Sequence, residues 1–338
     1  LSKSQRLPDR LHSSFQAVFC IDDREDSIRR HIEYLDPNSE TYGAPGFFGV
    51  AMYFQPYGGK FLEKNCPVPV TPKHLVKEIE INTSRDHELF HHKHSHTFLR
   101  GFLYSLSLGL TAGFRILFDL FRPKMRPDIA DAFSHMDVSG KLQIECSNPP
   151  QFEHGLQVGY TVEEMANVVE GLLKSIGLTN NFADIVYVVA HGSSSANNPH
   201  HGAHDCGACS GRPGGPNARI FAYMANHKGV RFLLEERGLH IPATTQFIGG
   251  MPDAASDEIG FYDTASIWES HLKKHQQYVQ LIENALDLNA KERARRFASI
   301  DINQDIKKIR RDIKDRSVSY FEPRPELGHG TSALCYVG

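Results

Sequence analysis

The chain has 338 residues and a formal net charge of -3 at pH 7, so it can bury a large core and gives no reason to expect a nucleic-acid partner. Charged residues at 23% and hydrophobic residues at 40% are ordinary values for a globular protein. Its six cysteines are too sparse for a disulfide scaffold, so we expect a reducing compartment with some thiols used for metal. No signal peptide is visible, and both ends look cut, so we expect a part of a longer protein.

The first predicted elements are a strand, a helix and a second strand. Phe15–Phe19 is a short apolar run that is typical of a buried strand. Ser27–Leu35 is predicted to be a helix, which an Asp-Pro-Asn sequence ends. Phe47–Phe54 is predicted to be a strand between glycines. Repeated prolines exclude a helix in Cys66–Pro72, so we expect an extended segment there.

A helical pattern is predicted from about Lys73 to Phe121. Within it, Phe102–Phe118 is apolar over a length near the lower limit for a membrane span. We expect a buried or interfacial helix there, which is also the candidate contact with a partner or a membrane. Histidines gather in His87–His96, and because no cysteine is near, a polar surface helix is favoured over a metal site. Pro123–Gly140 is expected to be a linker or an insertion.

The second half of the chain alternates helices with strands. Thr161–Ser175 has apolar residues on one face, and its first residue is a suitable N-cap. Ile185–Ala190 is predicted to be a strand, and the long loop that follows, residues 191–217, has a size that indicates a functional role. The other predicted elements are the helices Asn217–Lys228 and Val230–Glu236, the strand Thr244–Gly249, and the helices Trp268–Leu288 and Ala290–Asp315.

This alternation predicts an α/β fold with a parallel-sheet core and helical insertions. We divide the chain into four parts: a first part of the core (1–72), a helical insertion (73–150), a second part of the core with an active-site loop (151–265), and long helices with a C-terminal segment (266–338). Open α/β sheets bind ligands at the carboxyl ends of their strands. Two segments that follow neighbouring strands are therefore expected to meet there, however far apart they are in sequence.

The most informative chemical pattern is Cys20-x-Asp22-x-Arg24, which follows the first predicted strand directly. Far downstream, His191 ends another predicted strand, and Cys206 lies in the glycine-rich loop after it. Two thiols, one imidazole and one carboxylate are a suitable set of four ligands for zinc. The pattern therefore predicts a zinc site at Cys20, Asp22, His191 and Cys206.

Asp22 has two predicted roles in this site. It can be the fourth zinc ligand in a closed resting state, or it can pair with Arg24 and accept a hydrogen bond from water on the metal. Zinc lowers the pKa of its water and supplies hydroxide near neutral pH. The pattern therefore predicts a zinc enzyme that activates water.

Alternatives remain open for several of these residues. His204 competes with His191 as a ligand, and His191 is favoured because a strand holds it. Cys206-Gly207-Ala208-Cys209 is also typical of a zinc knuckle or a redox pair, although no second motif of this kind is present. The glycine-rich residues 211–219 lack the complete pattern of a nucleotide site. Ser193–Ser195 lack the complete pattern around a serine nucleophile.

The segments Phe19–Glu25 and His191–Arg219 resemble the DabA family, and Arg324-Pro325-Glu326 resembles another segment of that family. DabA proteins are the large soluble subunits of a two-part complex that takes up inorganic carbon in bacteria. The family's site is similar to that of β-carbonic anhydrases, so the resemblance implies a core of that type. It also implies these roles: Cys20, His191 and Cys206 as zinc ligands, Asp22 as the exchangeable fourth ligand, and Asp22 with Arg24 as a gating dyad.

The resemblance implies a function and a partner as well. Zinc hydroxide would attack CO2 and form bicarbonate, and this carbonic-anhydrase-like activity would require a membrane subunit of the DabB type, related to proton-conducting antiporter subunits. The chain would then lie peripherally on the cytoplasmic face of the inner membrane. The alternative is a structural zinc module, in which the metal ties residues 191–217 to the sheet and the chain docks on a membrane partner without turnover of its own.

Overall fold

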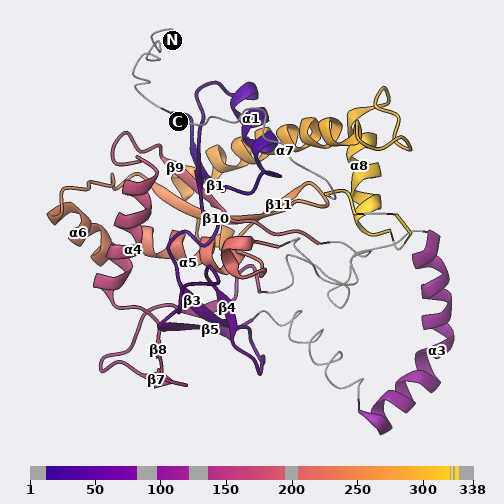
Figure 1. Cartoon of the computed structure of the whole chain (residues 1–338), viewed down its shortest axis with the longest axis horizontal. Helices are drawn as coiled ribbons and strands as arrows, with labels where there is room; N and C mark the ends of the chain where they lie inside the picture. Colours follow the sequence, from indigo (N-terminus) through magenta and orange to yellow (C-terminus); the bar gives the residue numbers. More distant parts are fainter. Residues whose placement is uncertain are drawn as a thin grey trace.

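The computed structural model describes residues 13–81, 97–121, 136–194, 205–319, 321–322 and 324–326. Two β-sheets and the helices around them make up the fold (Figure 1). The first sheet has five strands in the order β11-β10-β9-β1-β2. In chain order these strands are β1 (Gln16–Cys20), β2 (Glu40–Ala44), β9 (Ile185–Val189), β10 (Gln246–Asp253) and β11 (Glu258–Phe261).

Four strands of the first sheet are parallel, and only β11 runs antiparallel to its neighbour. Phe19 of β1 is paired with Val189 of β9, and Cys20 is paired with Ala44 of β2. The carboxyl ends of β1, β2 and β9 therefore lie at one edge of the sheet. This register confirms the predicted parallel sheet and brings the two chemical segments of the sequence to the same edge.

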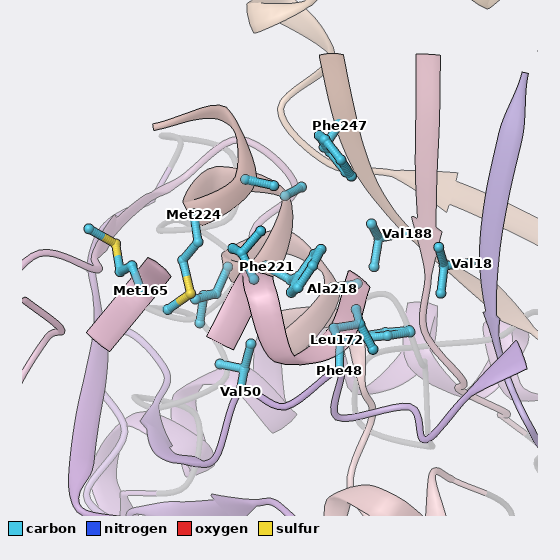
Figure 2. Packing of buried hydrophobic residues seen from close by; sticks show 14 of the residues in the cluster. Val18, Phe48, Val50, Met165, Leu172, Val188, Ala218, Phe221, Met224 and Phe247 are labelled. Atoms are coloured by element: carbon cyan, nitrogen blue, oxygen red, sulfur yellow. The ribbon is translucent and has the colours of Figure 1, made fainter. Parts of the chain in front are cut away.

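Both faces of the first sheet are buried. Alternate side chains of β1 point to opposite faces, as a strand requires, so Ala17 and Phe19 pack in one cluster and Val18 in the other. The helices α1 (Asp26–Leu35) and α7 (Glu269–Ala294) contribute side chains to the first cluster. The second cluster, which Figure 2 shows around Phe221, includes side chains of α4 (Val162–Ser175), α5 (Gly215–Asn226) and α6 (Lys228–Glu236).

A second sheet of six strands contains no strand of the first. Its members are β3 (Met52–Gln55), β4 (Glu63–Asn65), β5 (His74–Glu80), β6 (Lys141–Gln143), β7 (Phe152–Glu153) and β8 (Leu156–Val158). The prediction of a helix from Lys73 is wrong over β5, because pairing with β3 and β8 fixes an extended conformation that local pattern alone does not reveal. The prediction of a strand from Phe47 is also wrong before Met52. The backbone N–H groups of Phe48 and Val50 form the hydrogen bonds of turns there.

Other predicted elements are confirmed with shifted ends. The helix α4 begins after Thr161, whose side chain forms a capping box with Glu164. The helix α7 continues without a break to Ala294, and α8 (Ile306–Ser317) packs against it, so the predicted boundary at Leu288 is wrong. The strand β2 was absent from the prediction, because its Glu-Thr-Tyr-Gly-Ala sequence lacks an apolar run.

The predicted apolar helix is present as α3 (Phe98–Phe121), which extends at the side of the two sheets in Figure 1. Within the described ranges, no helix is both long and apolar enough to cross a membrane. The histidine cluster His87–His96 and most of Pro123–Gly140 lie outside the described residues. The division of the chain into four parts remains a prediction, whereas a mixed α/β fold with parallel strands is confirmed.

Candidate metal centre

The site begins where β1 and β9 end. Cys20 is the last residue of β1, and His191 follows the last residue of β9 by two positions. The carbonyl of His191 accepts a hydrogen bond from the backbone N–H of Gly214, at 2.9 Å, which ties this position to the start of α5. Parallel strand register and this backbone contact together place the two residues at one edge of the sheet.

Cys206 meets Cys20 from the loop before α5. Both thiols are buried, and they are hydrogen-bonded to each other. That hydrogen bond, together with burial, raises the pKa of the Cys20 thiol far above its ordinary value. The hydrogen bond lowers the pKa of Cys206, but contact with Cys209 and burial outweigh it and raise the pKa overall. Without a cation, this pair is therefore neutral, since two thiolates so close would repel each other.

Gly46 makes room for the two thiols. A Cβ at this position would lie 2.7 Å from the Cys206 sulfur and 2.8 Å from the Cys20 sulfur, so a larger residue would force the thiols to move. Gly46 comes just after β2, the strand that is paired with β1. The predicted ligands Cys20 and Cys206 thus share a space that a third segment of the chain leaves open.

Asp22 and Arg24 form a bidentate ion pair. The distances are 2.7 Å from Arg24 Nε to Asp22 Oδ1 and 2.8 Å from Arg24 Nη2 to Asp22 Oδ2. Burial by itself would raise the pKa of Asp22, but the hydrogen bonds and charge of Arg24 and the nearby His191 hold it at about 2. The carboxylate is therefore ionised at neutral pH and occupied by a guanidinium.

His191 is fully buried between Glu25 and Arg24. Its Nδ1 lies 2.6 Å from Glu25 Oε1, and its Nε2 lies 2.6 Å from Arg24 Nη2. A guanidinium has donors only, so Nε2 accepts and Nδ1 carries the proton that Glu25 accepts. This is the tautomer that a metal-binding imidazole needs, with a carboxyl group behind the ring, and in this structure the Nε2 lone pair accepts from Arg24.

The predicted residues thus fall into two groups at the same edge of the sheet. One holds the thiols of Cys20 and Cys206, and the other holds Asp22, Arg24 and His191, with Asp22 Oδ2 3.7 Å from His191 Nε2. Across the described ranges, no three His, Cys, Asp or Glu side chains form a group ready to hold a metal. The Arg24 guanidinium competes with a metal here, because it binds both the Asp22 carboxylate and the His191 imidazole.

The donor set nevertheless fits zinc in its chemistry. Zinc favours thiolate and imidazole ligands, and it accepts a carboxylate as a fourth. A divalent cation would also relieve the repulsion that keeps the two thiols protonated, because a coordinated thiol loses its proton. Asp22 lies two residues after Cys20, and its charge is one of the smaller causes that raise the pKa of the Cys20 thiol.

The competing residues take other positions. The thiol of Cys209 is buried, hydrogen-bonded with Cys206, and 3.7 Å from Asn217 Oδ1. Ser194 is hydrogen-bonded to Asp253 through its backbone N–H and its hydroxyl. Arg219 in the glycine-rich segment forms an ion pair with Asp263, so its positive charge is already neutralised by another residue of the chain. His204 and Ser195 lie outside the described residues.

A family model described as "Probable inorganic carbon transporter subunit DabA" matches residues 1–338. A probable inorganic carbon transporter subunit DabA from Azotobacter vinelandii is 49% identical over 325 residues, which cover 96% of this chain and 38% of the relative. One from Nitrosospira multiformis is 48% identical, over 96% of this chain and 36% of the relative. The chain belongs to the DabA family. It spans little more than a third of the length of these curated relatives.

No solved structure matches this DabA chain. The mixed α/β architecture therefore stands on the strands and helices described above, and a likeness to β-carbonic anhydrases remains a prediction of the sequence resemblance. Membership in the DabA family itself is confirmed by the family model and the two relatives.

Two residues of the DabA site had no predicted role. Glu25 lies in the quoted Cys20 segment, yet a glutamate before a helix is ordinarily an exposed capping residue, so sequence gives no sign of its burial. Gly46 stood out only as a residue beside a predicted strand. A glycine required by tertiary contact has no local signature, and only an alignment of many relatives would reveal it.

Proposed function

We propose that this chain is the zinc-dependent, carbonic-anhydrase-like part of an energy-coupled transporter of inorganic carbon, and that it hydrates CO2 to bicarbonate. The observation that carries the proposal is a chain of hydrogen bonds that runs from Glu25 to His191, then to Arg24 and Asp22. The paired thiols of Cys20 and Cys206 lie at the same edge of the sheet. The names of the relatives suggest the substrate class, since each is a probable inorganic carbon transporter subunit.

In this proposal Cys20, His191 and Cys206 would hold the zinc ion, and Asp22 would be the exchangeable fourth ligand. The metal supplies Lewis acidity, which makes water a nucleophile near neutral pH. Glu25 keeps the His191 ring oriented with Nε2 toward the metal, because Nδ1 donates to it at 2.6 Å. Glu25 and His191 are buried, so solvent does not compete for this hydrogen bond.

Arg24 governs whether Asp22 is free to bind the metal. While the bidentate pair is made, Asp22 would be held off a bound zinc ion, and zinc binding would require Arg24 to leave His191 Nε2, which it contacts at 2.6 Å. The ionised carboxylate then accepts a hydrogen bond from the attacking water and orients it toward CO2. When the pair breaks, Asp22 would be free to complete the ligand set and close the site.

We further propose that the chain works peripherally on the cytoplasmic face of the inner membrane, bound to a DabB-type membrane subunit related to proton-conducting antiporter subunits. The word "subunit" in the relatives' names supports an assembly of several chains. The contact candidate is α3, where Leu106 is 67% exposed and Leu110 is 81% exposed, because apolar surface of this kind favours a partner. CO2 hydration would then require the assembled complex.

The first test is the zinc content per chain, by elemental analysis, of the wild type and of Cys20→Ala, Cys206→Ala and Cys209→Ala. We expect one zinc that depends on Cys20 and Cys206 and not on Cys209. Full zinc in both of the first two variants would contradict the proposal. Zinc that depends on Cys209, or a reversible disulfide between Cys206 and Cys209, would favour a knuckle or a redox pair instead.

The structural zinc module is the second candidate, and Asp22→Ala separates it from an enzyme. The observation that favours it is the contact of Cys206, in the loop of residues 191–217, with Cys20 at the end of β1, because a metal held by both thiols would tie this loop to the sheet. An enzyme keeps most of its zinc in Asp22→Ala and loses CO2 hydration by the assembled complex. A structural module loses zinc or thermal stability and has no hydration activity to lose.

A further inference from the structure

Two polar residues of α7, Asn289 and Arg293, form a buried cluster with Asp257. They lie one turn apart on the helix and are 2% and 4% exposed. Asn289 Nδ2 lies 2.6 Å from Asp257 Oδ1, and Arg293 Nη2 lies 2.9 Å from the same oxygen. The side chain of Asp257 is fully buried and belongs to the turn of residues 254–257, between β10 and β11. The proposed reaction makes no use of these three residues.

On one side, the cluster is tied to the chain next to His191. The Arg293 guanidinium donates a hydrogen bond to the carbonyl of Ala254. The backbone N–H of Ala254 in turn donates to the carbonyl of Gly192, at 2.9 Å. Gly192 directly follows His191. Arg293 therefore fixes the turn that holds the backbone beside this proposed zinc ligand.

On the other side, the cluster is tied to the chain next to Glu25. The Ser27 hydroxyl donates a hydrogen bond to Asn289 Oδ1, and both side chains are buried. Ser27 lies in the first turn of α1, which packs on α7 (Figure 1). It comes two residues after Glu25, whose carboxyl group lies 2.6 Å from His191 Nδ1. Both partners of the Glu25–His191 hydrogen bond are therefore followed closely by residues that α7 holds.

Asp257, at the centre of the cluster, is held in an unfavourable state. Its φ is +56°, a left-handed backbone conformation that costs energy in a residue with a side chain. Its Oδ2 is buried and has no hydrogen-bond partner among the described residues. For a buried ion pair such as Arg293–Asp257, the cost of desolvation can exceed the attraction between the charges. The cluster is thus a poor way to stabilise a fold, and backbone strain of this kind is concentrated at functional sites.

We propose that Asn289 and Arg293 are positioning residues of the candidate metal centre, which keep the Glu25–His191 hydrogen bond in place by fixing the chain beside both partners. This inference rests on the proposed function and deepens it by assigning α7 a role at the site. Asn289 acts through the Ser27 hydroxyl. Arg293 acts through the turn that holds Gly192. The orientation of the His191 ring, and hence the direction of Nε2, depends on both.

Asn289→Ala removes the acceptor of Ser27 and one of the donors to Asp257. Because groups behind metal ligands typically change metal affinity by about 10-fold to 100-fold, we expect zinc to bind about tenfold more weakly. Ser27→Ala breaks the same contact from the side of α1 and removes fewer atoms, so it should weaken binding in the same direction. Asn284→Ala is the matched control, because Asn284 is an exposed residue of the same type on the same helix and should leave the affinity unchanged.

The test is a double-mutant cycle on the full-length protein, with zinc affinity measured by competition against a chromophoric chelator. Asn289→Ala is made in the wild type and in Glu25→Gln. We expect about tenfold weaker binding in the wild-type background and less than about threefold change in the Glu25→Gln background, where the carboxylate that orients His191 is already absent. An equal loss in both backgrounds, or no loss in the wild type, overturns the proposal.

A second readout needs no metal. In zinc-free protein with 15N-labelled histidine, the buried hydrogen bond to Glu25 should protect the Nδ1–H of His191 from exchange with water, so that it gives an NMR signal absent from His191→Gln. We expect this signal in the wild type and in Asn284→Ala. It should be lost in Asn289→Ala while circular dichroism shows that the fold persists, and a retained signal contradicts the proposal.

Ser27→Ala replaces Asn289→Ala in both measurements if the latter variant does not fold. The two levels of inference also fail in different ways. A wild type that binds no zinc overturns the proposed function. Normal zinc binding by the wild type, with unchanged affinity in Asn289→Ala and Ser27→Ala, overturns only the positioning role of α7.

Discussion

His191 and Glu25 share a hydrogen bond of 2.6 Å between Nδ1 and Oε1, and neither side chain is exposed to solvent. Burial raises the pKa of Glu25 to about 8, although the hydrogen bond and charge of His191 act in the opposite direction. Burial makes the ionised form of Glu25 unfavourable. A carboxylate behind an imidazole is nevertheless the arrangement that fixes metal-binding histidines in other proteins. The pair therefore connects the buried start of α1 to the candidate ligand set.

Glu25→Gln should weaken zinc binding by about 10-fold to 100-fold, because an amide orients the His191 ring less firmly than a carboxylate does. The measurement is competitive titration with a chromophoric chelator. Glu235→Gln is the control, since the Glu235 side chain is 66% exposed on α6 and should leave the affinity unchanged. Unchanged affinity in Glu25→Gln would show that His191 does not depend on this carboxylate.

Gly46→Ala should disrupt the thiol pair. The added Cβ would lie under 3.0 Å from both sulfur atoms, so Cys20 or Cys206 must move. We expect the zinc content to fall well below one per chain while the fold survives, as measured by elemental analysis and circular dichroism. Gly207→Ala is the control, because a Cβ there meets nothing within 4 Å. Equal zinc in both variants would contradict the predicted crowding.

The Asp22–Arg24 ion pair should make stability depend on pH in the acid range. The folded-state pKa of Asp22 is about 2, below its ordinary value of 3.8, so the ionised form stabilises the folded chain. This contribution is present above about pH 4 and is lost as the pH falls toward 2.

In chelator-treated protein, urea unfolding of the wild type and of Asp22→Asn should therefore differ at pH 6 by on the order of 1–2 kcal/mol. The difference should shrink as the pH is lowered. A difference that stays constant from pH 6 to the acid limit would show that Asp22 contributes by packing rather than by charge.

Phe221→Ala should destabilise the core beside the sheet by about 3–5 kcal/mol, because a large buried side chain leaves a cavity. Phe221 is fully buried and packs near Phe247 and Phe48 in Figure 2. The midpoint of chemical unfolding measures the effect. Phe232→Ala is the matched control, since Phe232 is 62% exposed and its loss should change the unfolding free energy by less than about 0.5 kcal/mol. Similar losses in both variants would contradict the packing described for this core.

The sequence predicted those elements whose pattern is local and strong. The β-branched run of β9 and the amphipathic pattern of α4 with Thr161 are readable within a single window, and both are confirmed. By contrast, β5 and β2 owe their extended form to neighbouring strands that lie far away in sequence, so local patterns missed them.

The same division holds for the candidate site. The sequence by itself determined which donor types exist, because Cys20, Asp22 and Arg24 are neighbours in the chain and their order is covalent. Only the tertiary structure decided that Cys206 lies against Cys20, that Gly46 leaves room for both thiols, and that Arg24 binds Asp22 and the distant His191 at once. The physical reason is that these contacts depend on parallel strand register and burial. Both arise from the summed packing of the whole sheet, and no short window of sequence contains them.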